Sequence, residues 1–358
     1  MNKEYPEMTN TPEKMIAGIP RVNLGFFPTP LHRLDNLSED LGVNLWIKRD
    51  DFTGRNQFGG NKTRKLEFLM GRALELGAES VVTYGATQSN HVMQTVWAAK
   101  RCGIKPIAYL AAMVKPDMDD LKGNMLLDSI YGAELHVVEP LEGESFEETE
   151  KRSFVMGAEK VAELNASGTP CYDIPIGGAN EYGTLGYVNC MVELAQQLPE
   201  DFNPKYLYHA TGSGGTMAGI AAGRKLMGLD FEVHSMMTLP MENTAGYAEA
   251  AAELANSALG LLGNSGQMPV VTGADFIVDN RHTGPDYEVP SEEGSEAIKL
   301  LARREGILVD PVYTGKAFAG MLADIRSGAV PQGSDILFLH TGGTTALFAE
   351  REILGDIF

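Results

Sequence analysis

Short apolar runs alternate with longer amphipathic stretches along most of this chain. The apolar runs end at polar or glycine residues and are typical of buried strands. They cover residues 45–50, 80–86, 105–113, 134–139, 205–212, 231–237 and 335–343. Stretches with helical spacing of apolar residues lie at 62–76, 90–102, 119–131, 145–166, 184–198, 216–227, 243–261, 292–305 and 315–327. Strands separated by such helices predict an α/β protein built of βαβ units with mainly parallel sheets.

Length and charge narrow this expectation. A chain of 358 residues is longer than one hydrophobic core usually serves, so two domains are expected. The 29 basic and 48 acidic residues give a net charge of -19, which repels phosphate backbones and anionic membranes. Nucleic acids and membranes are therefore not expected as partners. An anionic substrate would need a site that is locally positive or rich in backbone N–H groups.

The cysteines and the N-terminal stretch indicate a reducing compartment. Cys102, Cys171 and Cys190 are too few and too far apart for a disulfide framework or a Cys-x-x-Cys metal site, so they are expected to be small core residues. Residues 1–22 lack the apolar core of a signal peptide, and no later run reaches the roughly 18 apolar residues of a membrane span. We therefore expect a cytoplasmic protein.

The loops that follow the predicted strands are the first places to look for a site, because parallel α/β sheets bind ligands at the carboxyl ends of their strands. In "YGATQSNHVMQT" (84–95), Gln88, Ser89 and Asn90 lie at the positive end of a helix, which suits a small carboxylate. Helix capping by Ser89 or Asn90 is the alternative interpretation.

A second loop, "HATGSGGTMAGI" (209–220), combines converging glycine amides with the hydroxyls of Thr211, Ser213 and Thr216. It is no Walker loop, and Met217 stands where the dinucleotide pattern needs its third glycine. The loop therefore suits one phosphate monoester without a metal, although a tight turn that binds nothing is an equal alternative.

Lys62 in "FGGNKTRKLEF" (58–68) follows a glycine pair at the head of a predicted helix. A lysine there is ordinarily solvated, and Lys65 keeps that interpretation. Together with a phosphate loop and a carboxylate site, however, Lys62 completes what a pyridoxal phosphate enzyme needs: a lysine that binds the cofactor covalently, a cradle for its phosphate and a helix end for the amino acid's carboxylate.

Longer motifs resemble one family of such enzymes, the D-cysteine desulfhydrases and 1-aminocyclopropane-1-carboxylate deaminases. The motifs are "GGNKTRKLEFL", "GATQSNHVMQT", "IPIGGANEYGTLGYV", "TGSGGT", "LLARREGILVDPVYTGKAFAG" and "LFLHTGG", and the similarity runs from about residue 23 to the C-terminus. It implies pyridoxal phosphate fold type II, that of the tryptophan synthase β-subunit, with two three-layer α/β domains and the cofactor in the cleft between them. Residues 1–64 with 179–358 would form the large cofactor-binding domain and 65–178 the small one, and the protein is expected to be a homodimer.

The same resemblance implies roles for individual residues. Lys62 would bind the cofactor covalently, Asn90 would lie beside its 3-hydroxyl, and Thr314 would lie at its pyridine nitrogen. The phosphate would be held by Thr211, Gly212, Ser213, Gly214, Gly215 and Thr216. The substrate would contact Gln88, Ser89, Asn90, His91, Tyr287 and Tyr313, and the catalytic groups would be Lys62, Ser89, Tyr287 and Tyr313. The segment 280–290 departs from the family's glycine-rich pattern, because Asp286 and Glu288 flank Tyr287.

Thr314 separates the reactions within this family. The deaminase branch has a glutamate here that keeps the pyridine nitrogen protonated, whereas a neutral threonine holds that proton less well. A weaker electron sink favours immediate loss of a β-substituent, so D-cysteine cleavage to pyruvate, sulfide and ammonia is expected. The alternatives are cleavage of L-cysteate or a related β-substituted alanine, ring opening by a 1-aminocyclopropane-1-carboxylate deaminase, which Thr314 disfavours, and a non-catalytic protein that binds pyridoxal phosphate or an amino acid.

Overall fold

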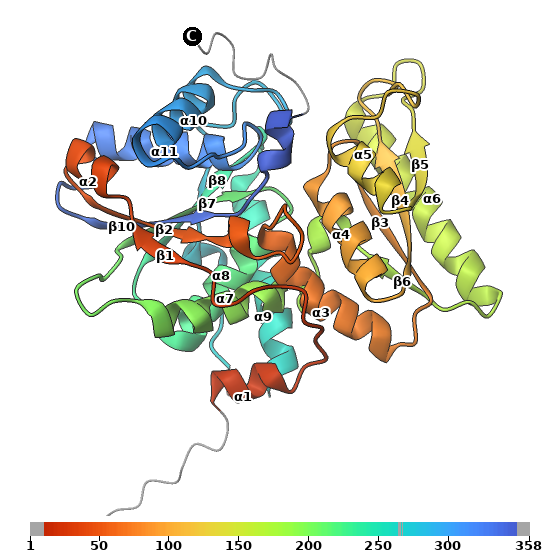
Figure 1. Ribbon diagram of the computed structural model, residues 1–358. Coiled ribbons are helices and arrows are strands. Elements are labelled where there is room, and N and C mark those ends of the chain that lie inside the picture. Colours follow the sequence, from red (N-terminus) through yellow and green to blue (C-terminus); the bar gives the residue numbers. More distant parts are fainter. Residues whose placement is uncertain (1–10, 264–265, 267, 349–358) are drawn as a thin grey trace, which may run out of the picture.

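The computed structural model describes residues 11–263, 266 and 268–348 of the chain, and these form two α/β domains side by side (Figure 1). Two predictions fall partly outside the described residues. The absence of a signal peptide concerns residues 1–10 among others, and the predicted large domain includes 349–358. Within those ranges no helix has the length and apolar character needed to cross a bilayer.

The large domain is built on a six-stranded sheet with the order β1-β2-β10-β7-β8-β9. Only β1 is antiparallel to its neighbour, and the other pairs are parallel. The strands are β1 Leu31–Arg33, β2 Asn44–Arg49, β7 Tyr206–Thr211, β8 Glu232–Met237, β9 Ile277–Asp279 and β10 Asp335–His340. β2 pairs along its whole length with β10, so strands almost 300 residues apart in the sequence are neighbours in this sheet.

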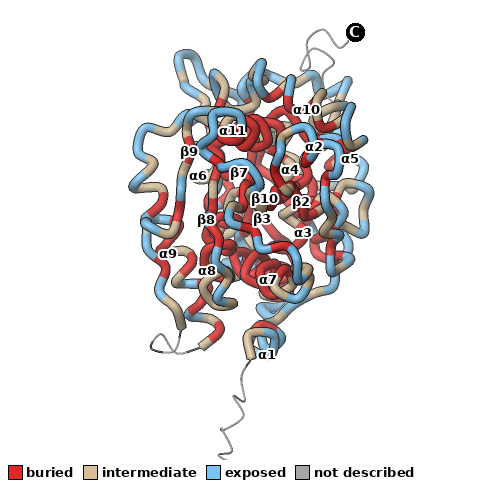
Figure 2. The backbone as a smooth tube through the Cα atoms, turned by 90° about the vertical axis from the view of Figure 1, so that its left-hand side faces the viewer, coloured by how far each residue is buried: buried red, intermediate tan, exposed pale blue. Residues whose placement is uncertain are grey.

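Helices cover both faces of the large sheet. The first face carries α2 Asp35–Leu41, α10 Glu292–Glu305 and α11 Thr314–Ser327, whose apolar side chains form one core with the strands. The second face carries α7 Glu181–Gln197 and α8 Gly215–Met227, with α9 Thr244–Leu262 and α1 Pro12–Ala17 packed outside them. Figure 2 shows that buried residues concentrate in the strands and in α7 and α8. This is the predicted three-layer arrangement.

The small domain repeats the same architecture around an all-parallel sheet with the order β5-β4-β3-β6. Its strands are β3 Ser80–Ala86, β4 Lys105–Ala111, β5 Glu134–Val138 and β6 Cys171–Ile174. The helices α4 Asn90–Arg101 and α5 Gly123–Ile130 pack on one face, and α6 Phe146–Ala166 packs on the other. Each sheet therefore has its own core, as expected of two domains.

The helix α3, Asn61–Glu75, lies between the two domains (Figure 1). Leu66 and Leu69 pack with Trp97 of the small domain, whereas Phe68 packs with α7 and α8 of the large one. The predicted division between residues 64 and 65 falls inside this helix, so the domain limits stay a prediction.

The cysteines are free, as expected. Cys171 and Cys190 are buried, and Cys102 is partly buried against a core cluster of the small domain.

The core of the small domain contains a carboxyl group that has no hydrogen-bond partner among the described residues. Asp128 on α5 is 1% exposed, and within the described residues neither of its carboxylate oxygens has a hydrogen-bond partner. Burial raises the pKa of Asp128 from 3.8 to about 8. The folded protein therefore keeps this proton between about pH 4 and pH 8, whereas the unfolded chain has lost it.

This difference makes stability fall as pH rises, because the unfolded state then binds fewer protons than the native state. We expect Asp128→Asn to remove this pH dependence. The unfolding free energy of the variant minus that of the wild type should therefore increase by about 3 kcal/mol from pH 5 to pH 7.5. Denaturant unfolding at both pH values measures it. Asp201→Asn, at an exposed position, serves as control, and an equal pH dependence in wild type and Asp128→Asn would contradict the expectation.

Candidate active site

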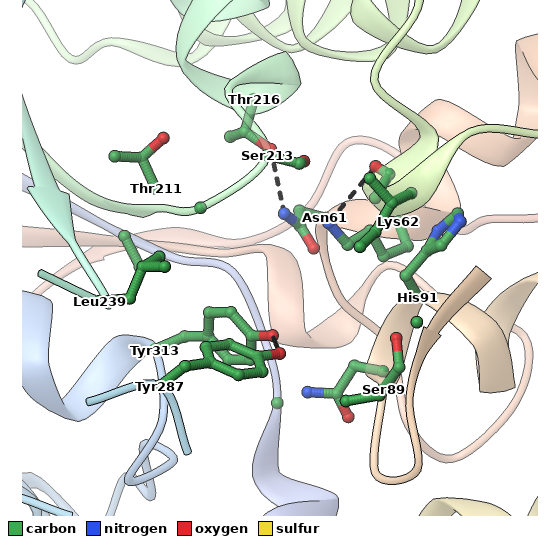
Figure 3. A pocket seen from close by; sticks show the side chains of 18 of the residues that line it. Asn61, Lys62, Ser89, His91, Thr211, Ser213, Thr216, Leu239, Tyr287 and Tyr313 are labelled. Atoms are coloured by element: carbon green, nitrogen blue, oxygen red, sulfur yellow. Dashed lines mark hydrogen bonds between the residues drawn. The ribbon is translucent and has the colours of Figure 1, made fainter. Parts of the chain in front are cut away.

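A cavity of about 610 Å³ lies between the two domains. Its wall includes the first residues of α3 and α4, the loop from β7 to α8, and the short helix η2 Ile176–Gly178. The start of α6, the tyrosines Tyr287 and Tyr313, and residues 341–343 after β10 complete it. Most of these segments follow the carboxyl ends of parallel strands, where the sequence predicted a site (Figure 3).

The glycine pair before α3 allows a close approach of three segments. Gly60 has φ +148° and forms a β-bridge with Gly342, and a Cβ atom on Gly59 would lie 2.2 Å from the carbonyl oxygen of Asp51. The Thr53 hydroxyl accepts a hydrogen bond from the Gly60 N–H and donates one to the Gly60 carbonyl. Only glycine fits this turn, which brings the first residues of α3 to the cavity.

Lys62 lies in the first turn of α3, and its side chain points into the cavity (Figure 3). Its Nζ lies 3.4 Å from the carbonyl oxygen of Gly177 in η2. Burial lowers the pKa of Lys62 to about 8, since a desolvated ammonium is less stable than the neutral amine. A lysine that is partly neutral near physiological pH can act as nucleophile or base.

Lys65 differs from the sequence-based expectation of a solvated surface residue. It is 1% exposed, and its Nζ donates to the same Gly177 carbonyl at 3.1 Å. Burial, and then the charge of Lys62, lower the pKa of Lys65 well below its usual value. A Cβ atom on Gly215 would lie 2.9 Å from Lys65 Nζ, so this amine lies directly behind the glycine loop. The helix turns Lys65 inward because residues three apart share a face.

The loop from β7 to α8 has the form of a phosphate cradle. Gly214 caps α8 in the left-handed conformation with φ +81°, and Thr211, Gly212, Ser213, Gly214 and Thr216 line the cavity. Asn61 donates to the Thr216 hydroxyl at 3.0 Å, and the Tyr247 hydroxyl donates to the Gly212 carbonyl at 2.9 Å. The helix N-terminus gives this site a positive potential in an acidic protein, and the loop hydroxyls and the Lys65 amine add hydrogen-bond donors.

The start of α4 forms another part of the wall. Ser89 caps the helix by accepting a hydrogen bond from the Val92 N–H at 3.3 Å, as one of the two interpretations of this loop predicted. The Asn90 side-chain oxygen accepts hydrogen bonds from Asn124 and Thr345, both at 2.8 Å. The first N–H groups of the helix have no acceptor within the helix, so they can bind a carboxylate.

Gln88 is not brought to the cavity wall. Its side chain instead donates to the Lys122 carbonyl at 3.2 Å and accepts from the Asn124 N–H at 2.9 Å, which joins the loop to the start of α5. In this geometry the Gln88 side chain does not contact the space in which a substrate would bind. Gln88 fixes the loop that carries Ser89 and Asn90.

His91 lines the cavity but is held inside the small domain. Its Nε2 lies 2.9 Å from the Thr83 hydroxyl and its Nδ1 lies 3.5 Å from the Thr95 hydroxyl. Burial, and then the charges of Lys62 and Lys65, lower the pKa of His91 well below its usual value. The ring is neutral at pH 7, so it brings no positive charge to a substrate carboxylate.

Tyr287 and Tyr313 lie next to each other, on the side of the cavity opposite the glycine loop (Figure 3). Their hydroxyls are hydrogen-bonded to each other, and the ring centroids are 6.0 Å apart. Burial raises the pKa of both tyrosines, and the proximity of other acidic groups adds to it. Both hydroxyls therefore keep their protons at physiological pH and can donate one.

Thr314 lies behind Tyr313, at the first residue of α11, and is fully buried. Its hydroxyl donates to the Asp310 carboxylate at 2.6 Å, and that carboxylate also accepts from the N–H groups of Val312, Tyr313 and Thr314. Thr314 does not line the cavity, nor does Gly215. Asp310 lies inside one of the motifs that resemble the family, but it stands three residues before the cap position Tyr313, so no capping pattern singled it out.

Comparison with known proteins gives the family. The model of the family described as "Pyridoxal-phosphate dependent enzyme" matches residues 22–342. This chain belongs to the pyridoxal-phosphate dependent enzymes. Its cofactor is pyridoxal phosphate, as predicted.

Individual members of the family are similar over nearly the whole chain. A D-cysteine desulfhydrase of Yersinia enterocolitica is 38% identical over 344 residues, which cover 95% of this chain and 98% of that protein. One from Yersinia pestis is 38% identical over 343 residues with the same coverage. The crystal structure of an ACC deaminase homologue matches with a TM-score of 0.82 at 35% identity, covering 97% of this chain and 99% of that one. A fungal L-serine ammonia-lyase from Rhizomucor miehei, at 18% identity and a TM-score of 0.60, shares the fold. Fold type II is thereby confirmed.

The residues of this cavity fit the cofactor that the family requires. A Cβ atom on Gly177 would lie 2.2 Å from Ser213 Oγ and 3.5 Å from Lys62 Nζ, so glycine keeps open the space between the lysine and the phosphate loop. Lys62 is the amine that faces this space, and Lys65 adds a buried amine donor behind the loop.

Several residues of the site carry no signal in the sequence. Asn61, Lys65 and Gly177 approach the cofactor space, and Asn124 and Asp310 hold the loops that line it. Of these, only Asn124 lies outside the motifs that resemble the family. The roles of all five depend on contacts between distant segments, which the motifs themselves do not indicate.

Proposed function

We propose that this enzyme catalyses β-elimination on a small β-substituted amino acid, with D-cysteine as the substrate and pyruvate, sulfide and ammonia as products. The observation that supports this most directly is the pairing of two proton-transfer groups in one cavity. Lys62 has a lowered pKa of about 8, whereas the Tyr287–Tyr313 pair has raised pKa values. Titratable groups whose pKa values are pushed apart in this way suit a base and an acid.

Lys62 acts as the base in this proposal. When bound, pyridoxal phosphate supplies an electron-accepting ring conjugated to the substrate nitrogen, which acidifies the α-hydrogen. The free, neutral Nζ of Lys62 would take the α-proton, because its pKa lies close to physiological pH.

Tyr287 and Tyr313 act as the acid. Their hydroxyls are hydrogen-bonded to each other, so a proton given by one to the leaving sulfur can be replaced from the other. The leaving group departs as hydrogen sulfide, and the released 2-aminoacrylate takes up water to give pyruvate and ammonia. These hydroxyls stay protonated, so they can donate a proton to the leaving group but cannot take the α-proton, which assigns the direction of proton transfer.

The start of α4 positions the substrate. Its N–H groups and the Ser89 hydroxyl bind the carboxylate, while Asn90 is held by Asn124 and Thr345 beside the cofactor's 3-hydroxyl. Gln88 contributes through the loop rather than by direct contact. Because His91 is neutral and packed against threonines, the helix end supplies the positive potential here.

Thr314 lies behind the cavity wall at Tyr313 and brings no charge to the ring nitrogen of a bound cofactor. Its hydroxyl donates to the Asp310 carboxylate and accepts from the Asp310 N–H. A neutral partner stabilises a protonated ring nitrogen less than a carboxylate would. This supports β-elimination over ring opening. The homodimer and the cytoplasmic location remain parts of the proposal.

Product analysis tests this function. The enzyme, loaded with pyridoxal phosphate, is incubated with D-cysteine, L-cysteine, L-cysteate, D-serine and 1-aminocyclopropane-1-carboxylate. We expect pyruvate with sulfide from D-cysteine. Pyruvate with sulfite from L-cysteate, or 2-oxobutyrate from the cyclopropane, as the main activity would overturn the substrate assignment. Tight cofactor binding with no keto acid from any of them would identify a non-catalytic binder.

A further inference from the structure

The charges on the cavity wall are unevenly distributed. Apart from Lys62, the described wall residues that carry a charge are Glu147, Glu150 and Asp286. Glu147 and Glu150 belong to the first turns of α6 in the small domain, whereas Asp286 precedes Tyr287 in the large one. Acidic side chains thus approach one part of the cavity from both domains.

These carboxylates differ in how far their charge is compensated. Glu147 is mostly exposed and forms an ion pair with Lys151 at 2.6 Å, and Asp286 accepts a hydrogen bond from the Tyr287 N–H at 2.7 Å. Glu150 is half-buried, and the described part of the chain offers its carboxylate no ion-pair partner. Glu150 is therefore the wall carboxylate whose charge is least compensated.

Glu150 acts on the tyrosine end of the cavity. Glu150 lines the same cavity as Tyr287 and Tyr313. Burial is the main cause that raises the pKa of both tyrosines, and the negative charges of Glu288 and then Glu150 add to it. The carboxylate is thus within electrostatic range of the hydroxyls that receive the leaving group.

A substrate in this cavity meets opposite potentials at its two ends. Its α-carboxylate lies at the positive start of α4, and its β-substituent extends to the tyrosines and Glu150. A negative charge on that substituent would face Glu150 in a partly desolvated space, where like charges repel strongly.

We propose that Glu150 selects substrates by the charge of the β-substituent, excluding sulfonate, carboxylate and phosphate groups and admitting neutral or cationic ones. The assignment rests on the proposed function, since it places the β-substituent at the tyrosine end. It deepens that function by naming the substrate class: three-carbon amino acids whose β-group is a thiol, a thioether or an amine.

Binding to the holoenzyme tests this selection, and stopped-flow absorption of the cofactor separates it from turnover. Dissociation constants are taken from the initial absorption change with D-alanine, D-aspartate and D-2,3-diaminopropionate, which carry no β-group, a β-carboxylate and a β-ammonium. In Glu150→Gln we expect D-aspartate to bind about tenfold more tightly relative to D-alanine, and D-2,3-diaminopropionate to bind more weakly relative to D-alanine. Unchanged D-alanine binding and cofactor absorption show that the variant is folded.

Glu147→Gln is the matched control, because Glu147 lies on the same wall but is exposed and paired with Lys151. We expect it to change these ratios less than twofold. An equal gain in both variants would overturn the assignment to Glu150, and so would unchanged ratios in Glu150→Gln. If D-cysteine is cleaved but the affinities relative to D-alanine do not change in Glu150→Gln, the proposed charge selection is wrong and the proposed reaction stands. If they move as expected while D-cysteine is not cleaved, the proposed reaction fails and the charge selection stands.

Discussion

Replacing Lys62 by alanine is expected to abolish turnover and the covalent link to pyridoxal phosphate. The residue lies at the head of α3 with its amine in the cavity, and burial lowers its pKa to about 8. Loss of both nucleophile and base should lower kcat at least about 10³-fold. The assays are keto acid formation and the visible absorption of the lysine-bound cofactor. Borohydride reduction followed by peptide mass spectrometry identifies the linked residue in the wild type.

Lys65→Ala is the control for this substitution, because both amines contact the Gly177 carbonyl. Lys65 lies behind the phosphate loop, so its loss should weaken cofactor affinity about tenfold to a hundredfold and leave the covalent link intact. A Lys62→Ala protein that kept the link, with Lys65→Ala losing it, would transfer the covalent role to Lys65.

The second large effect is expected from Arg64, two residues after Lys62. Arg64 is 2% exposed. Its guanidinium donates to the Asp50 carboxylate through two nitrogens, at 2.7 and 2.8 Å, and to the Glu193 carboxylate at 2.9 Å. Burial alone would raise the pKa of Asp50, but the charge of Arg64 holds it below its usual value. Arg64→Met leaves two buried carboxylates without this cation, so the unfolding free energy should fall by about 3–5 kcal/mol.

Denaturant unfolding of the holoenzyme measures this loss. Arg72→Met, on the same helix, removes a largely exposed pair with Glu75 and a cation–π contact with Tyr182, and should cost about 1 kcal/mol. Adding Asp50→Asn to Arg64→Met should restore part of the stability, because it removes one uncompensated charge. A loss within 1 kcal/mol for Arg64→Met would contradict a structural role for this network.

Much of the fold could be predicted because the long elements have strong periodic patterns. Each of the seven predicted strands and nine predicted helices is present, with ends shifted by a few residues at most. The elements that the pattern did not predict are short: α1, α2, β1, β6 and β9. A strand of three residues such as Leu31–Arg33 has too few positions to show alternation, and its existence depends on pairing with β2.

The site could be predicted where a motif and its function lie in one segment. Lys62, Ser89 and the loop 211–214 are brought to one cavity, as are the two tyrosines. Lys65 points inward because it donates to Gly177, and Gln88 lies away from the cavity because it binds Asn124. Both partners lie far away in the sequence. Likewise, the charge of Glu150 matters only because α6 faces the tyrosines across the interdomain cavity. Such long-range contacts leave no local pattern.

The pairing of β2 with β10 has a consequence for synthesis on the ribosome. The small sheet is complete once Ile174 has emerged, so that domain can fold while the chain is still growing. The parallel neighbour of β2 is β10, and the ribosome must synthesise the chain from Arg49 to Asp335 before β10 begins. At about 5–20 residues per second this takes on the order of tens of seconds. During that interval the backbone groups on one edge of β2 lack their final partner. The nascent large domain, rather than the small one, is therefore where we expect chaperones to bind.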